Sequence, residues 1–200
     1  MSKFDKNYYE RYAKLTLDTA FPEWGLHFAL ADRPDLQNET DGIGIEVTSS
    51  TPSQIREVAS LGAKLLGKKV SVEEEKRFRG QLLLTCDRVA WAYSPTKGLV
   101  DSDRSPDIIA SISHKRSVWI EKQYKDFRVK GLYIFIGTGV FDDWMLEEIE
   151  KADSFSFFQI VIINAMDRIY YYQDGWKKKE FTDEELAEFK KKALEAGEKP

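Results

Sequence analysis

The sequence predicts an α/β protein in which a mixed β-sheet is flanked by helices. Three observations favour this fold class. A helical apolar pattern opens the chain over 5–20, apolar residues alternate strictly over 43–47, and near-continuous apolar runs occupy 131–137 and 157–163. Runs of the last kind are typical of strands that are covered on both faces. Strands that alternate with helical segments then favour a sheet with helices on both sides.

The composition is that of one globular domain. The chain has 200 residues, of which 42% are hydrophobic and 13% aromatic, enough for a sizeable core. Its formal net charge is −4, so a nucleic-acid partner would have to bind a local basic patch. The single Cys86 cannot form an intrachain disulfide, and no apolar run approaches the length of a membrane span. We therefore expect a cytoplasmic protein with no membrane association and of undetermined oligomeric state.

The N-terminal segment is predicted to form a helix over 5–20. Tyr8, Tyr12 and Leu15 recur there at spacings of four and three residues, which places them on one helix face. The run 26–30 that follows is read as the first strand or as the approach to it.

The next stretch, 43–48, is predicted to be a strand because its apolar residues alternate with small or polar ones. Glu46 and Thr48 then point away from the apolar face. Asp35 precedes this strand, across a tight reversal marked by Asp41-Gly42. The carboxylates of Asp35 and Glu46 are thus expected side by side, where they repel each other unless a cation lies between them. Hard oxygen ligands of this kind suit Mg²⁺ or Mn²⁺.

The middle of the chain is predicted to hold a helix over 52–66 and then an insertion. The apolar runs 81–84 and 89–93 are too short to assign to a helix or a strand, and loop-forming residues follow them. We therefore expect one domain over 1–200 that carries an insertion at about 68–106.

A long helix is predicted to begin near Pro106, with an apolar stripe that continues to Phe127. The strongest basic cluster of the chain lies off this stripe. Lys115 and Lys122 are seven residues apart and therefore share one helix face. The cluster is read either as a phosphate-binding surface or as a solvated helix face. The residues expected to bind nucleic acid are Lys115, Arg116, Lys122 and Lys125.

The C-terminal part is predicted to alternate buried strands with polar helices. The apolar runs are expected in the sheet, and the charged segments are expected at the surface. The expected elements are a strand at 131–137, a helix at 141–149, a strand at 157–163, a hairpin partner at 169–172, a polar link at 176–180 and a surface helix at about 182–196.

Pro34-Asp35, followed after a short spacer by Glu46-Val47-Thr48, resembles the metal motif of the PD-(D/E)xK nuclease superfamily. That motif consists of an Asp, then a strand with an acid, an apolar residue and a Lys. Asp35, Glu46 and Val47 match its first three members, and Thr48 stands in the place of the Lys. The order helix, three strands, helix, strand also resembles the core of this superfamily. The resemblance implies a restriction-endonuclease-like fold.

The resemblance also implies a bound metal, Mg²⁺ or Mn²⁺. Its ligands would be Asp35, Glu46 and the carbonyl oxygen of Val47. In this superfamily the opening helix often supplies a further acid, for which Glu23 is preferred over Glu10. Asp32 competes with Asp35 for the first ligand position, although Pro34-Asp35 is the better match to the motif.

Two functions are possible, depending on whether another lysine takes the place of the missing motif lysine. Some members of the superfamily supply this lysine from a neighbouring helix, and Lys115 and Lys122 are the candidates here, ahead of Lys64. Gln37 and Thr48 are expected to support the metal ligands. The resemblance implies a divergent metal-dependent nuclease that acts on phosphodiester bonds. The alternative is a non-catalytic module of the same fold that binds nucleic acid or a protein partner, which the replacement of Lys by Thr favours.

Overall fold

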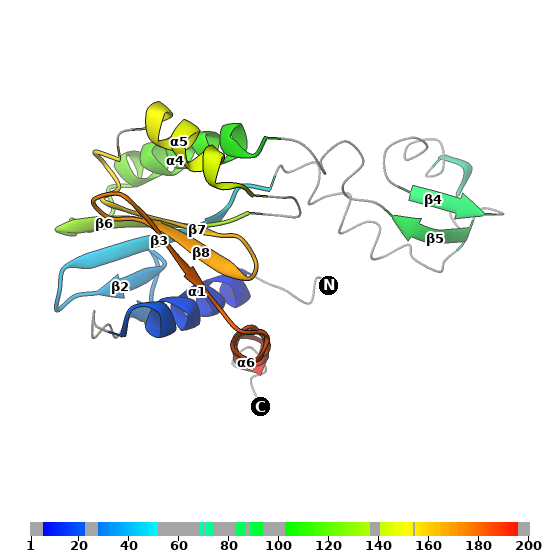
Figure 1. Ribbon diagram of the computed structural model, residues 1–200, viewed down its shortest axis with the longest axis horizontal. Coiled ribbons are helices and arrows are strands. Elements are labelled where there is room, and N and C mark those ends of the chain that lie inside the picture. Colours follow the sequence, from blue (N-terminus) through cyan, green and yellow to red (C-terminus); the bar gives the residue numbers. More distant parts are fainter. Residues whose placement is uncertain are drawn as a thin grey trace.

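The structure is a computed structural model that describes residues 6–22, 28–51, 69, 71–73, 83–86, 89–93, 103–136, 141–153 and 155–195. Its largest element is a seven-stranded sheet in the order β1-β2-β3-β6-β7-β8-β9 (Figure 1). These strands are β1 (Ala29–Leu30), β2 (Leu36–Asn38), β3 (Ile43–Ser49), β6 (Val129–Phe135), β7 (Ile160–Asn164), β8 (Arg168–Tyr172) and β9 (Trp176–Glu180). The helices described are α1 (Lys6–Ala20), α4 (Ser105–Glu121), α5 (Asp143–Ala152) and α6 (Asp183–Glu195).

The sheet is mixed. Its three central strands β3, β6 and β7 run parallel to one another, whereas β1, β2 and β3 on one side and β7, β8 and β9 on the other are antiparallel. The crossover from β3 to β6 contains α4, and the crossover from β6 to β7 contains α5. Parallel strands need such long connections, which usually include a helix. The predicted α/β fold with a mixed sheet between helices is therefore confirmed.

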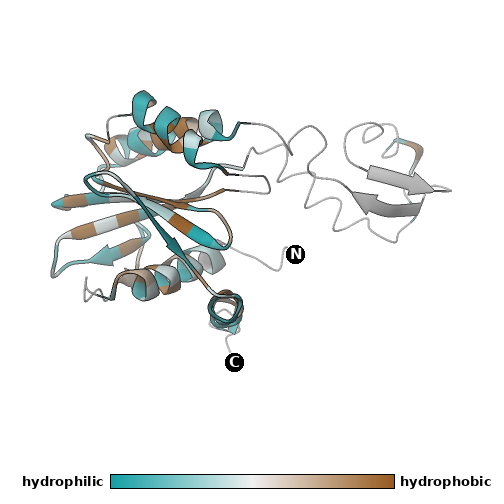
Figure 2. Ribbon diagram, viewed as in Figure 1, coloured by the Kyte–Doolittle hydropathy of each residue, from teal (hydrophilic) through white to brown (hydrophobic). Residues whose placement is uncertain are grey.

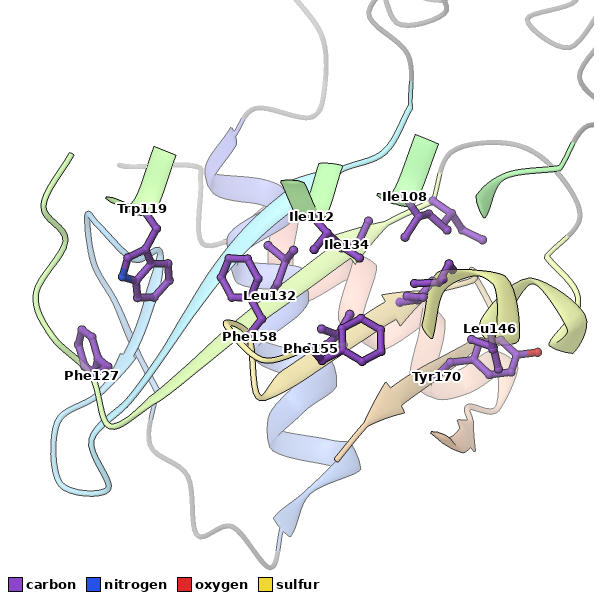
Figure 3. Packing of buried hydrophobic residues seen from close by; sticks show 14 residues of the cluster. Ile108, Ile112, Trp119, Phe127, Leu132, Ile134, Leu146, Phe155, Phe158 and Tyr170 are labelled. Carbon is purple, nitrogen blue, oxygen red and sulfur yellow. The ribbon is translucent and has the colours of Figure 1, made fainter. Parts of the chain in front are cut away.

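Two hydrophobic layers cover the sheet. On one face, α1 and α6 pack against a cluster that includes Ile45, Tyr133 and Ile162. On the other face, α4 and α5 pack against a cluster that includes Leu132 and Val161 (Figure 3). Figure 1 shows α4 and α5 on one side of the sheet and α1 and α6 on the other. The period-two alternation of side chains along each strand explains why neighbouring residues enter different layers.

One C-terminal prediction is wrong. The segment 176–180 is not a link, because it pairs with β8 as the edge strand β9, and its lysines give that edge a hydrophilic surface (Figure 2). Exposed lysines are a common protection of edge strands. Helix α6 lies at the position of the predicted surface helix; most of its residues are exposed, and it buries Phe189 and Ala193 against α1. The Nε atom of Arg11 donates a hydrogen bond to the carbonyl oxygen of Ala193 at 2.7 Å.

The predicted helix 52–66 lies outside the described residues. Within the predicted insertion, the apolar runs form strands β4 (Leu83–Cys86) and β5 (Val89–Tyr93), which pair as a separate two-stranded antiparallel sheet. None of the helices described is both long and apolar enough to cross a membrane.

Candidate functional site

Asp35 and Glu46 lie on the same face of the sheet, as the sequence predicts. Leu36 pairs with Ile45 in the β2–β3 ladder, which brings the preceding Asp35 opposite Glu46 on the other face. Glu46 itself pairs with Leu132, a member of the layer under α4 and α5. Both acids are buried, with exposed fractions of 2% for Asp35 and 5% for Glu46. Two buried ionisable side chains therefore share the face of the sheet that α4 covers.

Asp35 is held in place by the neighbouring strand. Its Oδ2 atom accepts a hydrogen bond from the backbone N–H of Val47 at 2.8 Å. Its own backbone carbonyl accepts a hydrogen bond from the N–H of Ala31, also at 2.8 Å. Asp32, the alternative to Asp35, has an exposed side chain that pairs with Arg33 at 3.6 Å. The buried position belongs to Asp35, so the choice of Asp35 over Asp32 agrees with the geometry.

Lys115 reaches Glu46 from α4. Its Nζ atom lies 2.6 Å from Oε1 of Glu46, and the exposed fractions of the two side chains are 18% and 6%. An ammonium group so close to a buried carboxylate forms a charge-assisted hydrogen bond. Lys115 of α4 thus places a positive charge beside Glu46, on the face of the sheet that α4 covers.

Tyr124 is a member of this site that sequence reasoning missed. Its hydroxyl donates a hydrogen bond to Oε1 of Glu46, the oxygen that also binds Lys115, over 3.4 Å. Burial, followed by the negative charges of Glu46 and Asp35, raises the pKa of Tyr124 to about 12. The phenol therefore remains a neutral donor at physiological pH.

The C-terminus of α4 explains how Tyr124 reaches Glu46. Gln123 adopts a left-handed conformation with φ of 49°. The N–H of Gln123 bonds to the carbonyl of Ile120 at 3.3 Å, and the N–H of Tyr124 bonds to that of Trp119 at 3.4 Å. These two bonds define a Schellman motif, in which the residue after the left-handed one packs back onto the last turn. The rings of Tyr124 and Trp119 accordingly lie 5.0 Å apart.

Sequence reasoning missed this helix end because Gln123 replaces the glycine that usually marks it. It therefore extended the helix to Phe127, whereas α4 ends at Glu121. Phe127 nevertheless joins the same buried layer as Trp119, from the loop that follows α4 (Figure 3). An apolar pattern continued past the end of the helix because loop residues also contribute to the core.

Gly44 allows the loop after α4 to approach β3 closely. A Cβ atom at Gly44 would lie 2.7 Å from the ring of Phe127 and 2.7 Å from Cγ of Pro34. Such distances are shorter than real Cβ contacts, so any larger residue would push these side chains away. The absence of a side chain at Gly44 thus brings the segment before Asp35 and the loop containing Tyr124 onto the same strand.

The predicted basic cluster does not form one surface. Arg116 forms an ion pair with the buried Asp153, which follows α5, so it ties α4 to α5 and does not extend toward Glu46. Lys125 lies in the loop after α4, where it pairs with the exposed Glu39 at 2.5 Å. Lys122 is the exposed C-cap residue of α4. Of the four predicted nucleic-acid-binding residues, only Lys115 is brought to the acids.

The other residues predicted to bind or support the metal lie as follows. Glu23 lies outside the described residues. Glu10 belongs to α1, whose buried residues Ala13 and Leu17 pack on the opposite face of the sheet. Gln37 and Thr48 share the face of Glu46 by alternation, and the Gln37 amide donates to the carbonyl of Pro34 at 3.1 Å. Thr48 is half-buried.

The residues present fit a hard divalent cation. Within the described residues, no three His, Cys, Asp or Glu side chains gather as a metal cluster. Mg²⁺, however, usually keeps several waters and is bound by one or two carboxylates, which Asp35 and Glu46 can provide. Glu46 already binds the ammonium of Lys115 at 2.6 Å, so a cation would have to share the carboxylate with it or displace it. The carbonyl of Val47 points to the side of Asp35, because the N–H and C=O of one strand residue point the same way.

Comparisons with known proteins identify no relative. No protein-family model, curated protein or solved structure matches the chain. The function is therefore inferred from the chemistry of the site and from the arrangement of the elements that form it.

Proposed function

We propose that the chain is a divergent metal-dependent nuclease of the PD-(D/E)xK type, in which Lys115 replaces the motif lysine. The observation that carries this proposal is the 2.6 Å contact between Nζ of Lys115 and Oε1 of Glu46. It joins a lysine from a helix to the acid of the motif across 69 residues of sequence. A half-buried ammonium and two buried carboxylates on one face are charges that metal-dependent phosphodiester hydrolysis can use.

The order of the elements supports the same proposal. Helix α1 is followed by the antiparallel strands β1, β2 and β3, and then, after the separate pair β4 and β5, by α4 and by β6, which is parallel to β3. This order resembles the restriction-endonuclease-like core of helix, three meandering strands, helix and strand. Asp35 directly precedes β2 and Glu46 lies within β3, which are the positions expected for the motif acids.

Each residue of the site has a distinct role in this proposal. Mg²⁺ or Mn²⁺ bound at Asp35 and Glu46 would neutralise charge on the scissile phosphate and lower the pKa of a bound water. The N–H of Val47 orients Asp35. Lys115 places a positive charge within reach of a phosphate oxygen, a role that the uncharged hydroxyl of Thr48 cannot fill. Nucleic acid is the expected substrate, because it presents such phosphates along its whole length.

The proposal is tested by Glu46→Gln, which keeps the side-chain size and removes the charge. We expect cleavage of plasmid DNA, single-stranded DNA or RNA in Mn²⁺ to fall by more than about 100-fold, since a metal contributes several kcal/mol to the transition state. Glu39→Gln is the matched control, because Glu39 is also paired with a lysine but is exposed. A wild-type protein that cleaves none of these substrates, and whose melting temperature Mn²⁺ does not change, would contradict the proposal.

A non-catalytic nucleic-acid-binding module is the second candidate. It is favoured by Thr48, which leaves β3 without a charge at the position of the motif lysine, and by the exposure of Lys122 and Arg128 after α4. This candidate predicts salt-dependent binding of nucleic acid without cleavage. Electrophoretic mobility shifts at several salt concentrations, with cleavage assayed in the same samples, distinguish the two functions.

A further inference from the structure

We infer that Tyr124 is a positioning residue whose hydroxyl keeps Glu46 oriented toward a divalent cation. The inference rests on the proposed function, since it concerns the proposed metal site. Tyr124 is not one of the residues that match the PD-(D/E)xK motif, so its role is additional to theirs.

Two donors with different charges converge on one oxygen of Glu46. The ammonium of Lys115 lies 2.6 Å from Oε1, and the hydroxyl of Tyr124 lies 3.4 Å from the same atom. Donors that come from two directions restrict rotation of the carboxylate. A divalent cation at Glu46 would repel the charged ammonium, but it would not repel a neutral hydroxyl. Tyr124 is therefore a partner that can stay on Glu46 once a cation is bound.

The position of the Tyr124 hydroxyl is determined by the backbone at the end of α4 and by the packing of the Tyr124 ring. The Schellman motif sets the backbone of Tyr124, and the ring packs on Trp119, which is only 4% exposed. Because the ring is held by packing and not by the hydroxyl, Tyr124→Phe removes the hydrogen bond and leaves the packing in place. This separation makes the role of the hydroxyl testable.

The test is a Mn²⁺ titration of the full chain, followed both by the melting temperature and by the electron paramagnetic resonance signal of free Mn²⁺. We expect Tyr124→Phe to weaken Mn²⁺ binding about tenfold, a usual effect of losing a partner that orients a metal ligand. Its melting temperature without metal should stay close to that of the wild type. Neither measurement depends on catalytic activity.

Tyr172→Phe is the matched control. The hydroxyl of Tyr172 donates to Oε1 of Glu150 at 3.4 Å, the same length as the Tyr124 bond, on the surface of α5. Its loss should leave Mn²⁺ binding unchanged. Trp119→Phe is a second variant, which loosens the ring packing but keeps the Tyr124 hydroxyl, so it should weaken Mn²⁺ binding less than Tyr124→Phe does.

The possible outcomes separate this inference from the proposed function. If the wild type binds Mn²⁺ and Tyr124→Phe binds it equally well, the inference is overturned and the proposed metal site stands. Equal losses of affinity in Trp119→Phe and Tyr124→Phe would assign the effect to packing and overturn it as well. A wild type that binds no Mn²⁺ would overturn both proposals.

Discussion

The two faces of the sheet each carry a tyrosine hydroxyl within a polar cluster, but only one cluster is charged. Under α1, the hydroxyl of the fully buried Tyr133 bonds to Thr16 at 2.8 Å and to the Asn164 amide at 2.7 Å. Under α4, the hydroxyl of Tyr124 shares a glutamate with a lysine. The network under α1 is neutral and joins α1, β6 and β7. The cluster under α4 contains charged side chains.

The neutral cluster has a structural role, whereas the charged cluster points to a chemical function. A neutral, satisfied network rigidifies a core without the cost of burying ions. A buried ion pair is poor evidence for added stability, because desolvation of the two ions opposes their attraction. The polar cluster under α1 is therefore explained by folding alone. The charges under α4 call for a function, which is why we place the candidate site there.

The largest effect on stability is expected from Lys115→Met. From the two acids alone, the sequence suggests that removing one of them relieves repulsion and does not lower the melting temperature. The ion pair changes this expectation for Glu46, because loss of its cation leaves a buried negative charge. We expect Lys115→Met to lower the free energy of unfolding by about 3 kcal/mol, measured by urea denaturation without metal.

A double variant tests whether this loss comes from the buried charge of Glu46. Lys115→Met combined with Glu46→Leu replaces the pair with apolar side chains of similar size, which is often neutral or stabilising. We expect the double variant to recover most of the lost stability. If it is as unstable as the single variant, the α4 face depends on the lysine stem for packing, and the contrast between the two faces is weaker than we infer.

A smaller effect is expected on the neutral face. Tyr133→Phe leaves the buried Asn164 amide without the hydroxyl oxygen that accepts its hydrogen bond. We expect a loss of about 1–2 kcal/mol in the free energy of unfolding, the usual cost of an unsatisfied buried donor. Mn²⁺ binding should not change, because Tyr133 lies under α1. A change in Mn²⁺ binding would show that the two faces are coupled through the sheet.

A further effect concerns pH. The pKa of Tyr124 is raised from 10.0 to about 12 by burial and by the charges of Glu46 and Asp35. A raised pKa means that the folded state favours the protonated phenol, so this contribution to stability is complete below pH 10 and is lost as the pH rises through about 12. Other tyrosines, including Tyr133, also have raised pKa values and contribute in the same direction.

The test therefore compares the free energy of unfolding of the wild type with that of Tyr124→Phe. Between pH 10 and pH 12, the wild type should lose more stability than Tyr124→Phe, which has no phenol at this position. Urea denaturation at several pH values gives this difference directly. Parallel curves for the two chains would show that Tyr124 titrates as it does in the unfolded state.

The pattern of single segments was enough to predict most of the central elements. The alternation over 43–48 predicted both the strand β3 and the face to which Glu46 points, and both are found. Such predictions succeed because they depend on the period of two along one strand. The pairing of Trp176–Glu180 with β8 was missed, because a strand of charged residues at a sheet edge carries no apolar pattern.

The sequence by itself determined that Asp35 and Glu46 would share a face, since one reversal and one alternating strand lie between them. Only the tertiary structure decided which of the basic residues after Pro106 would reach them. Lys115, Arg116 and Lys122 are close in sequence, yet they meet Glu46, Asp153 and solvent respectively. The packing of α4 on the sheet decides these partners, and this packing depends on contacts between segments far apart in the chain.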